Sequence, residues 1–180
     1  MTLYRCFDAA FPPATAPPGC SAVLGYIGRN GYTPHVWTLP EWDRFAHLIQ
    51  FPAYVPDPSE NPKAAAVRAT QAMRDLGWAP WQDARRVVVF DLETLILPAW
   101  YQQAAAEVAQ QGYAACAYGS ESTILANAAA DVWLAAWNGN PVLEPGQTIH
   151  AHQYANAGPF DVSVVDDWLF ARGGQGPRHT

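Results

Sequence analysis

The chain has 180 residues; half of them are hydrophobic, 14% are charged, and the formal net charge is −6 at pH 7. This length and apolar content predict one domain with a sizeable core, and an aromatic share of 13% suits an aromatic-lined cleft. The lysines and arginines are scattered, which argues against a nucleic-acid groove, and no apolar run reaches the roughly 20 residues of a membrane helix.

Strand-like apolar segments recur along the whole chain, separated by turn-forming or helix-like stretches. They predict strands at Leu3–Asp8, Ala22–Gly28, His47–Tyr54, Arg86–Glu93, Ala114–Tyr118, Val132–Trp137, Thr148–Tyr154 and Phe160–Val165.

Four of the intervening segments predict helices. Leu39–Phe45 has a proline near its first turn, and Pro62–Leu76 is rich in alanine and follows Asn61 as a cap. Pro98–Gln111 ends before Gly112, a common stop signal, and Glu121–Ala130 is a shorter candidate.

Eight strands that alternate with helices in one α/β domain favour a closed parallel barrel, the (β/α)8 or TIM-type barrel, over an open sheet. Such a barrel usually takes about 200 residues or more, so some crossovers must be loops. The proline-rich stretch FPPATAPPG after the first strand is one of them. We expect this compact barrel to span 1–172 and a Gly-rich polar tail to span 173–180.

The stretch VVVFDLET, residues 87–94, is a strand that is apolar on both faces and ends in two carboxylates. Because strand side chains alternate in direction, Asp91 and Glu93 are predicted to point the same way. A strand of this kind is usually buried inside a parallel sheet, so the two acids predict a site and not a solvated surface.

Other polar and aromatic residues also fall near strand ends, where the active sites of such barrels lie. The predicted mouth therefore collects Asp8, Arg29, Tyr54, Asp91, Glu93, Tyr118, Trp137 and Gln153.

Other chemistries have weaker support in the sequence. His150 and His152 share one strand face, but no further ligands on that face are evident, which favours packing over zinc. Asp91 and Glu93 with a histidine could hold Mg2+ for phosphoester hydrolysis, but the chain lacks a cluster of basic residues for phosphate. No metal and no cofactor is predicted.

The three cysteines have no metal-type spacing. Cys116 is predicted to be a small core residue, while a disulfide between Cys6 and Cys20 is left open.

Six blocks occur in the order seen in family 25 lysozymes: CFDAAFPP, VVVFDLET, AYGSES, VWLAAW, HQYANAG and FDVSVVD. The chain also resembles the glycoside-hydrolase-like domains of actinobacteria and their phages (domain-of-unknown-function group 1906), most clearly in GYIGRNGYTPHVW. The resemblance implies an irregular β/α barrel that cleaves the β-1,4 bond between N-acetylmuramic acid and N-acetylglucosamine.

The resemblance also implies roles for individual residues. Glu93 would be the general acid with Asp91 in support, and Asp8 and Asp161 would complete an acidic floor, with Asp166 as the alternative to Asp161.

Five residues of the predicted mouth are the candidates for substrate binding: Tyr118, Trp137, Gln153, Arg29 and Tyr54. In VWLAAW, the family pattern turns Trp133 and Trp137 toward the barrel interior, with Trp133 deeper and Trp137 nearer the mouth.

The expected function is therefore a muramidase-type glycosidase whose partner is peptidoglycan or a related wall polysaccharide. The alternative is a barrel that binds wall glycan, or packs with other phage virion or tail proteins, without turnover. The N-terminus lacks a standard secretory signal, which predicts a phage-encoded or virion-associated protein, or one released to act at the wall.

Overall fold

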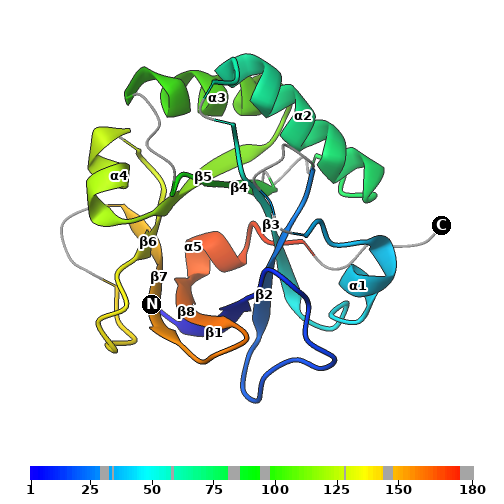
Figure 1. The fold of residues 1–180 in the computed structure, drawn as a ribbon, viewed down its shortest axis with the longest axis vertical. Coiled ribbons are helices and arrows are strands. Elements are labelled where there is room, and N and C mark those ends of the chain that lie inside the picture. Colours follow the sequence, from blue (N-terminus) through cyan, green and yellow to red (C-terminus); the bar gives the residue numbers. More distant parts are fainter. Residues whose placement is uncertain are drawn as a thin grey trace.

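Eight strands close into a barrel in the order in which they occur along the chain (Figure 1). The structure is a computed structural model that describes residues 1–28, 33, 35–57, 59–80, 86–93, 98–127, 129–143 and 148–174. The strands are β1 (Leu3–Asp8), β2 (Ala22–Tyr26), β3 (Ile49–Tyr54), β4 (Val87–Asp91), β5 (Ala114–Gly119), β6 (Val132–Ala135), β7 (Ile149–Asn156) and β8 (Asp161–Asp166). Each predicted strand is confirmed, with ends that differ by a few residues.

One strand runs against the others, which corrects the expectation of an all-parallel barrel. Neighbouring strands from β1 to β7 pair in parallel, whereas β8 pairs antiparallel with both β7 and β1. The short connection 157–160 explains this direction, because a parallel return needs a crossover of about a dozen residues or more. The start of β8 therefore lies at the same end of the barrel as the C-terminal end of β1.

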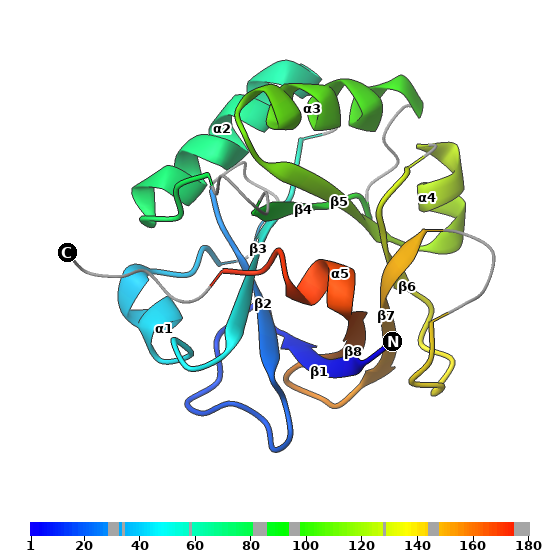
Figure 2. The same cartoon turned by 180° about the vertical axis from the view of Figure 1, so that it is seen from behind.

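Helices cover the barrel unevenly within the described residues. α1 (Leu39–Asp43), α2 (Pro62–Asp75), α3 (Pro98–Gln110) and α4 (Glu121–Ala126) follow β2 to β5, as predicted, and α2 and α3 lie side by side on one flank (Figures 1 and 2). Asn61 caps α2 by accepting bonds from two backbone N–H groups, and Gly112 follows α3 in a left-handed conformation. The connection 9–21, which contains the proline-rich stretch, has no helix.

A fifth short helix, α5 (Asp167–Phe170), was not predicted, and it closes the end of the barrel opposite the mouth. Its Leu169 is fully buried in the apolar cluster of the barrel interior. Beyond it, Gly174 exchanges two backbone hydrogen bonds with Gln50 of β3. Gly173 lies so close to β3 that a Cβ atom there would clash with a methyl group of Ile49. These two residues of the predicted tail are thus docked on the barrel, and the remainder lies outside the described residues.

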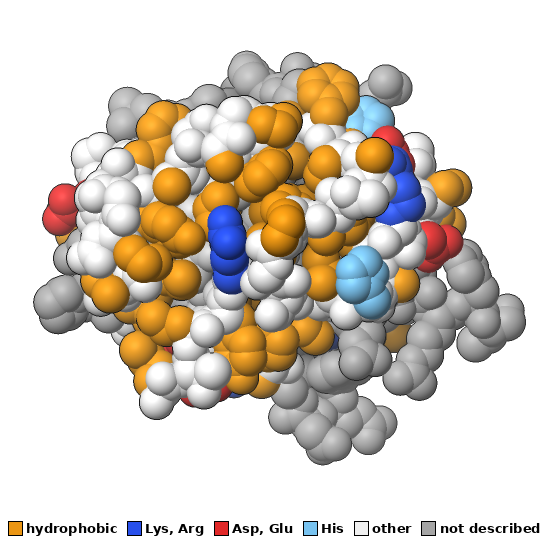
Figure 3. Space-filling model, turned by 90° about the horizontal axis from the view of Figure 1, so that it is seen from below, with side chains coloured by type: hydrophobic (Ala, Val, Ile, Leu, Met, Phe, Trp, Pro, Cys, Tyr) orange, Lys and Arg blue, Asp and Glu red, His pale blue; other side chains and the backbone are white. Residues whose placement is uncertain are grey.

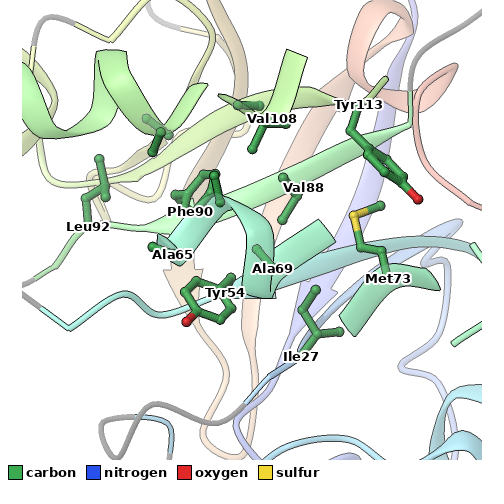
Figure 4. Close-up of a cluster of buried hydrophobic side chains, with 14 of the residues drawn as sticks. Ile27, Tyr54, Ala65, Ala69, Met73, Val88, Phe90, Leu92, Val108 and Tyr113 are labelled. Atoms are coloured by element: carbon green, nitrogen blue, oxygen red, sulfur yellow. The ribbon is translucent and has the colours of Figure 1, made fainter. Parts of the chain in front are cut away.

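Alternating side chains divide the core into two layers, as β4 illustrates. Val87 and Val89 belong to the apolar cluster inside the barrel, and Asp91 continues that face. Val88 and Phe90 point outward into a second cluster between the barrel and the helices (Figure 4). The inference of a strand that is apolar on both faces is confirmed.

The three cysteines are free thiols, so the structure contains no Cys6–Cys20 disulfide. Cys6 and Cys116 are fully buried inside the barrel, whereas Cys20 packs against the outer cluster.

Hydrophobic side chains are spread over the side seen in Figure 3, and charged ones are few there, in keeping with the low charge content. Among the described residues, no helix combines the length and apolar character that crossing a membrane requires.

Candidate active site

Carboxyl groups from three strands meet at the mouth of the barrel. Asp8 ends β1 and Asp91 ends β4, as expected for the C-terminal ends of parallel strands. Asp161 begins β8 and is the Cα partner of Asp8, because β8 is antiparallel. Glu93 follows two residues after Asp91 and is exposed. The four acids singled out in the sequence are therefore brought to one end of the barrel.

The mouth contains a pocket of about 350 Å3 with acidic and aromatic walls. Three carboxyl side chains and four aromatic rings line it together with small and polar residues: Asp8, Glu93, Asp161, Tyr26, Tyr118, Trp137, Phe160, Ala9, Ala10, Asn156, Gly158 and Pro159. A volume of this size falls within the range of small-molecule sites.

Asp91 lies beside this pocket and is buried, with an exposed fraction of 5%. The Tyr26 hydroxyl donates to its Oδ2 at 3.3 Å, and the backbone N–H of Glu93 donates to its Oδ1 at 3.2 Å. Asp91 thus orders the backbone that carries Glu93, while the Glu93 side chain faces the pocket.

Gln153 of β7 lies beneath the pocket and is fully buried. Its Nε2 donates to Asp8 Oδ2 at 3.1 Å. Its Oε1 accepts from the Tyr118 hydroxyl at 2.9 Å and from the indole N–H of Trp137 at 2.6 Å. Burial raises the pKa of the Tyr118 phenol far above its ordinary value, so this hydroxyl stays a donor.

Burial is the main reason why Asp8 holds its proton. It raises the pKa of Asp8 to about 8, the nearby carboxylates of Asp161, Asp91 and Glu93 add to the rise, and the hydrogen bond from Gln153 opposes it. Burial also raises the pKa of Asp161. Asp8 is therefore largely protonated at neutral pH.

The other two acids also titrate above their ordinary range. Burial, followed by the charge of Glu93, raises the pKa of Asp91 to about 7 against the opposing hydrogen bonds from Tyr26 and the Glu93 N–H. Glu93 is exposed as a whole residue, but partial desolvation of its carboxyl at the pocket, followed by the charge of Asp161, raises its pKa. A mouth with four such groups holds both protons and negative charge near neutral pH, the condition that acid–base chemistry needs.

Asp8→Asn is expected to flatten the pH dependence of stability and to depress activity. Because folding raises the pKa of Asp8 from 3.8 to about 8, the folded state retains a proton that the unfolded chain releases. The free energy of unfolding of the wild type should therefore fall as pH rises from about 4 to about 8, and less so in the variant.

Chemical denaturation at stepped pH measures this slope. Asp75→Asn, which changes an exposed aspartate at the end of α2, is the control. If Asp8→Asn keeps the wild-type slope and is merely less stable, Asp8 is a structural residue.

Two tryptophans of VWLAAW occupy different depths, as predicted. Trp133 is fully buried inside the barrel, whereas Trp137 is 60% exposed and lines the pocket. Trp137 has a φ of 40°, in the left-handed region where a bulky residue costs on the order of 1–3 kcal/mol. Such a conformation persists only where neighbouring contacts hold it, and residues of this kind cluster at functional sites.

Two of the predicted substrate-binding residues do not line the pocket, and a third lies outside the described residues. Tyr54 does not line the described pocket; its ring lies in the outer cluster beside Phe90, at a centroid distance of 6.0 Å, because its position on β3 points outward (Figure 4). Gln153 lies under the pocket wall. Arg29 falls outside the described residues.

Three residues that line the pocket are not among the predicted site residues: Tyr26, Asn156 and Phe160. Tyr26 was detectable, because alternation from the inward-facing Leu24 directs it into the mouth at the end of β2. The prediction extended that strand to Gly28 and so chose Arg29 instead. Asn156 ends β7, which the sequence predicts to end at Tyr154. Phe160 precedes β8 and reaches the mouth only because β8 is antiparallel.

His150 lies at the end of the barrel opposite the mouth, whereas Nδ1 of His152 lies 2.6 Å from the backbone oxygen of Val142 in the β6–β7 connection. His150 stacks on Trp168 of α5 at 3.9 Å between ring centroids, and its two ring nitrogens lie 2.9 Å from Asp166 and 3.1 Å from Asp131. This places Asp166 far from the mouth and leaves Asp161 as the acid of β8 in the pocket. In the described part of the chain, no group of three or more His, Cys, Asp or Glu is arranged to hold a metal.

Comparisons with known proteins support the fold. No known protein family matches the sequence, and none of the curated proteins matches it. A solved structure of an uncharacterised B. stearothermophilus protein is similar, with a TM-score of 0.77 and 17% sequence identity over 95% of this chain and 100% of the other. At this identity the similarity concerns the fold alone: a single α/β domain with a closed eight-stranded barrel.

Proposed function

We propose that this protein is a glycoside hydrolase of the bacterial cell wall, which cleaves the β-1,4 bond between N-acetylmuramic acid and N-acetylglucosamine. The observation that carries the proposal is the cluster of four carboxyl groups with raised pKa values at one aromatic-lined pocket. Glycosidic cleavage requires one carboxyl that holds a proton and another that is ionised, and coupled acids in a shared site provide both.

Glu93 is the proposed general acid. Its side chain faces the pocket, where it can reach a glycosidic oxygen, and its raised pKa keeps it protonated to higher pH than an ordinary glutamate. Asp91 is buried behind it and holds its backbone, so Asp91 supports the acid. Asp8 and Asp161 form the acidic floor: Asp8 retains its proton at neutral pH, and the ionised carboxylate of Asp161 beside it would stabilise positive charge developing on the sugar ring.

The aromatic walls suit a sugar substrate. Trp137 presents an exposed indole at the edge of the pocket, and Tyr26, Tyr118 and Phe160 add further ring surface. Flat apolar faces next to hydrogen-bonding groups are what pyranose rings pack against.

In this proposal the barrel is an irregular member of the (β/α)8 class, similar to the family 25 lysozymes and the glycoside-hydrolase-like domains of actinobacteria and their phages. Its seven parallel strands support that assignment, and the antiparallel β8 is the irregularity. The protein would act at the cell wall, reached from a phage particle or by release from the cell.

The test is digestion of purified peptidoglycan followed by analysis of the products. We expect soluble fragments whose new reducing ends are N-acetylmuramic acid, identified by borohydride reduction and mass spectrometry. Reducing ends on N-acetylglucosamine would contradict the assigned bond.

The exposed Trp137 equally suits a barrel that binds wall glycan without turnover. A pull-down with insoluble peptidoglycan, run beside the digestion, separates the two functions. Binding without any new reducing end would replace the hydrolase with a binding protein, and neither binding nor release would reject both.

A further inference from the structure

The side chain of Gln153 connects three separate parts of the mouth. It lies on β7 and contacts Asp8 on β1, Tyr118 on β5 and Trp137 in the β6–β7 connection. Gln153 is fully buried and does not line the pocket. A bound sugar would therefore contact Asp8, Tyr118 and Trp137, not Gln153 itself.

Donor and acceptor chemistry determines which way the Gln153 amide points. An indole N–H only donates, so the amide atom 2.6 Å from Trp137 Nε1 must be the oxygen. The same oxygen accepts from the Tyr118 hydroxyl, which leaves the amide nitrogen to face Asp8. If the amide were flipped, its NH2 group would face the indole N–H of Trp137, and two donors cannot form a hydrogen bond. The indole therefore fixes the orientation in which the amide nitrogen donates to Asp8.

The backbone of Gln153 holds the same tryptophan a second time. Its carbonyl oxygen accepts from the backbone N–H groups of Ala136 and Trp137, both at 3.1 Å. Trp137 is therefore fixed by a main-chain and a side-chain bond to one residue, which accounts for its left-handed φ of 40°.

We propose that Gln153 is the positioning residue of this pocket: its amide oxygen holds the Trp137 indole over the mouth, and its amide nitrogen orients the Asp8 carboxyl. The role given to the pocket rests on the proposed function, whereas the coupling of Trp137 to Asp8 through one amide does not. The consequence is that the position of a sugar-binding surface and the ionisation of a floor carboxyl are linked.

Two substitutions of Gln153 distinguish the role of its amide oxygen from that of its amide nitrogen. Gln153→Met has a similar length and removes all three side-chain hydrogen bonds, to Asp8, Tyr118 and Trp137. Gln153→Glu keeps an oxygen for Tyr118 and Trp137 but removes the donor to Asp8. Gln50→Met is the matched control, because Gln50 is also a fully buried barrel glutamine and donates to the backbone oxygen of Trp42, outside the pocket.

The measurements are the carboxyl carbon titration of Asp8 and the indole N–H resonance of Trp137 by NMR. In Gln153→Met we expect the Asp8 midpoint to rise by about 1 pH unit, because a hydrogen bond to the ionised form is lost, and the Trp137 indole proton to move upfield. In Gln153→Glu we expect the Asp8 midpoint to rise and the indole signal to stay near its wild-type position. Gln50→Met should change neither.

A substitution at Trp137 tests the same Trp137–Gln153 hydrogen bond even if the variants at the buried Gln153 do not fold. Trp137→Phe alters a largely exposed residue, keeps an aromatic ring of smaller size, removes the indole donor, and should shift the side-chain amide resonances of Gln153. Unchanged Gln153 amide signals in Trp137→Phe, or an unchanged Asp8 midpoint in folded Gln153→Met, would overturn the proposal. Both readouts are independent of wall hydrolysis, so they hold whether or not the protein proves to be a hydrolase.

Discussion

Glu93→Gln is expected to lower wall hydrolysis by roughly 10²–10⁴-fold, the usual contribution of a positioned general acid. The amide has nearly the same shape as the carboxyl but cannot deliver a proton to the leaving oxygen. Stability should change little, because Glu93 is exposed and its backbone N–H still donates to Asp91. Initial rates of reducing-end release and a thermal melt on the same preparation measure both quantities.

The pH profile adds a second readout for Glu93. The acid acts in its protonated form, and burial together with Asp161 raises its pKa, so wild-type activity should fall as pH rises through that raised value. Glu107→Gln, on the outer helix α3, is the control and should retain wild-type rates. Retention of most activity in Glu93→Gln would remove Glu93 from the catalytic role.

Trp133→Ala is expected to destabilise the protein by about 3–5 kcal/mol, the usual cost of deleting a large buried aromatic side chain. Trp133 is fully buried inside the barrel, packs edge-to-face on Phe51 at 5.6 Å between ring centroids, and donates to Ser163 Oγ at 3.1 Å. The substitution leaves a cavity and removes a partner from a buried hydroxyl. Denaturant titration at neutral pH measures the loss.

Trp137→Ala is the companion variant, with the opposite expectation. Its indole is 60% exposed, so the loss of stability should be modest, while glycan binding should weaken by about 1–2 kcal/mol, a typical loss for one aromatic contact. Pull-down of wall glycan, normalised to folded protein, measures the affinity. Equal destabilisation of the two variants with unchanged glycan affinity would make Trp137 a structural residue and remove it from the binding site.

The acidic strand VVVFDLET shows how far local sequence patterns reach. Alternation of side chains depends only on backbone geometry within one strand, so the inward direction of Asp91 and the outward direction of Phe90 were predictable. Alternation puts Trp133 and Trp137 on one face, and the resemblance, not alternation, predicted the deeper position of Trp133, which is buried, and the outer position of Trp137, which is exposed. By contrast, the second predicted strand extends past Tyr26 to Gly28. Arg29 was therefore predicted as the site residue in place of Tyr26, which lines the pocket.

The direction of the last strand was within reach of the sequence but was not inferred. The stretch between the seventh and eighth predicted strands is too short for a parallel crossover. Taking this into account predicts an antiparallel β8, which puts Asp161 at the mouth and Asp166 at the far end, as the register with β1 shows. Without it, the choice between the two aspartates depended on the resemblance alone.

The sequence by itself determined the local features: the eight strands, four of the helices, the two faces of the acidic strand β4 and the acids at the strand ends. Only the tertiary structure decided which side chains meet. Asp8 and Gln153 lie 145 positions apart, yet they share a hydrogen bond, and the raised pKa of Asp8 depends on burial by elements from the whole chain. The physical reason is that strand periodicity is a property of consecutive residues, whereas burial, charge coupling and hydrogen-bond partners at the mouth arise only when the barrel closes and joins β8 to β1.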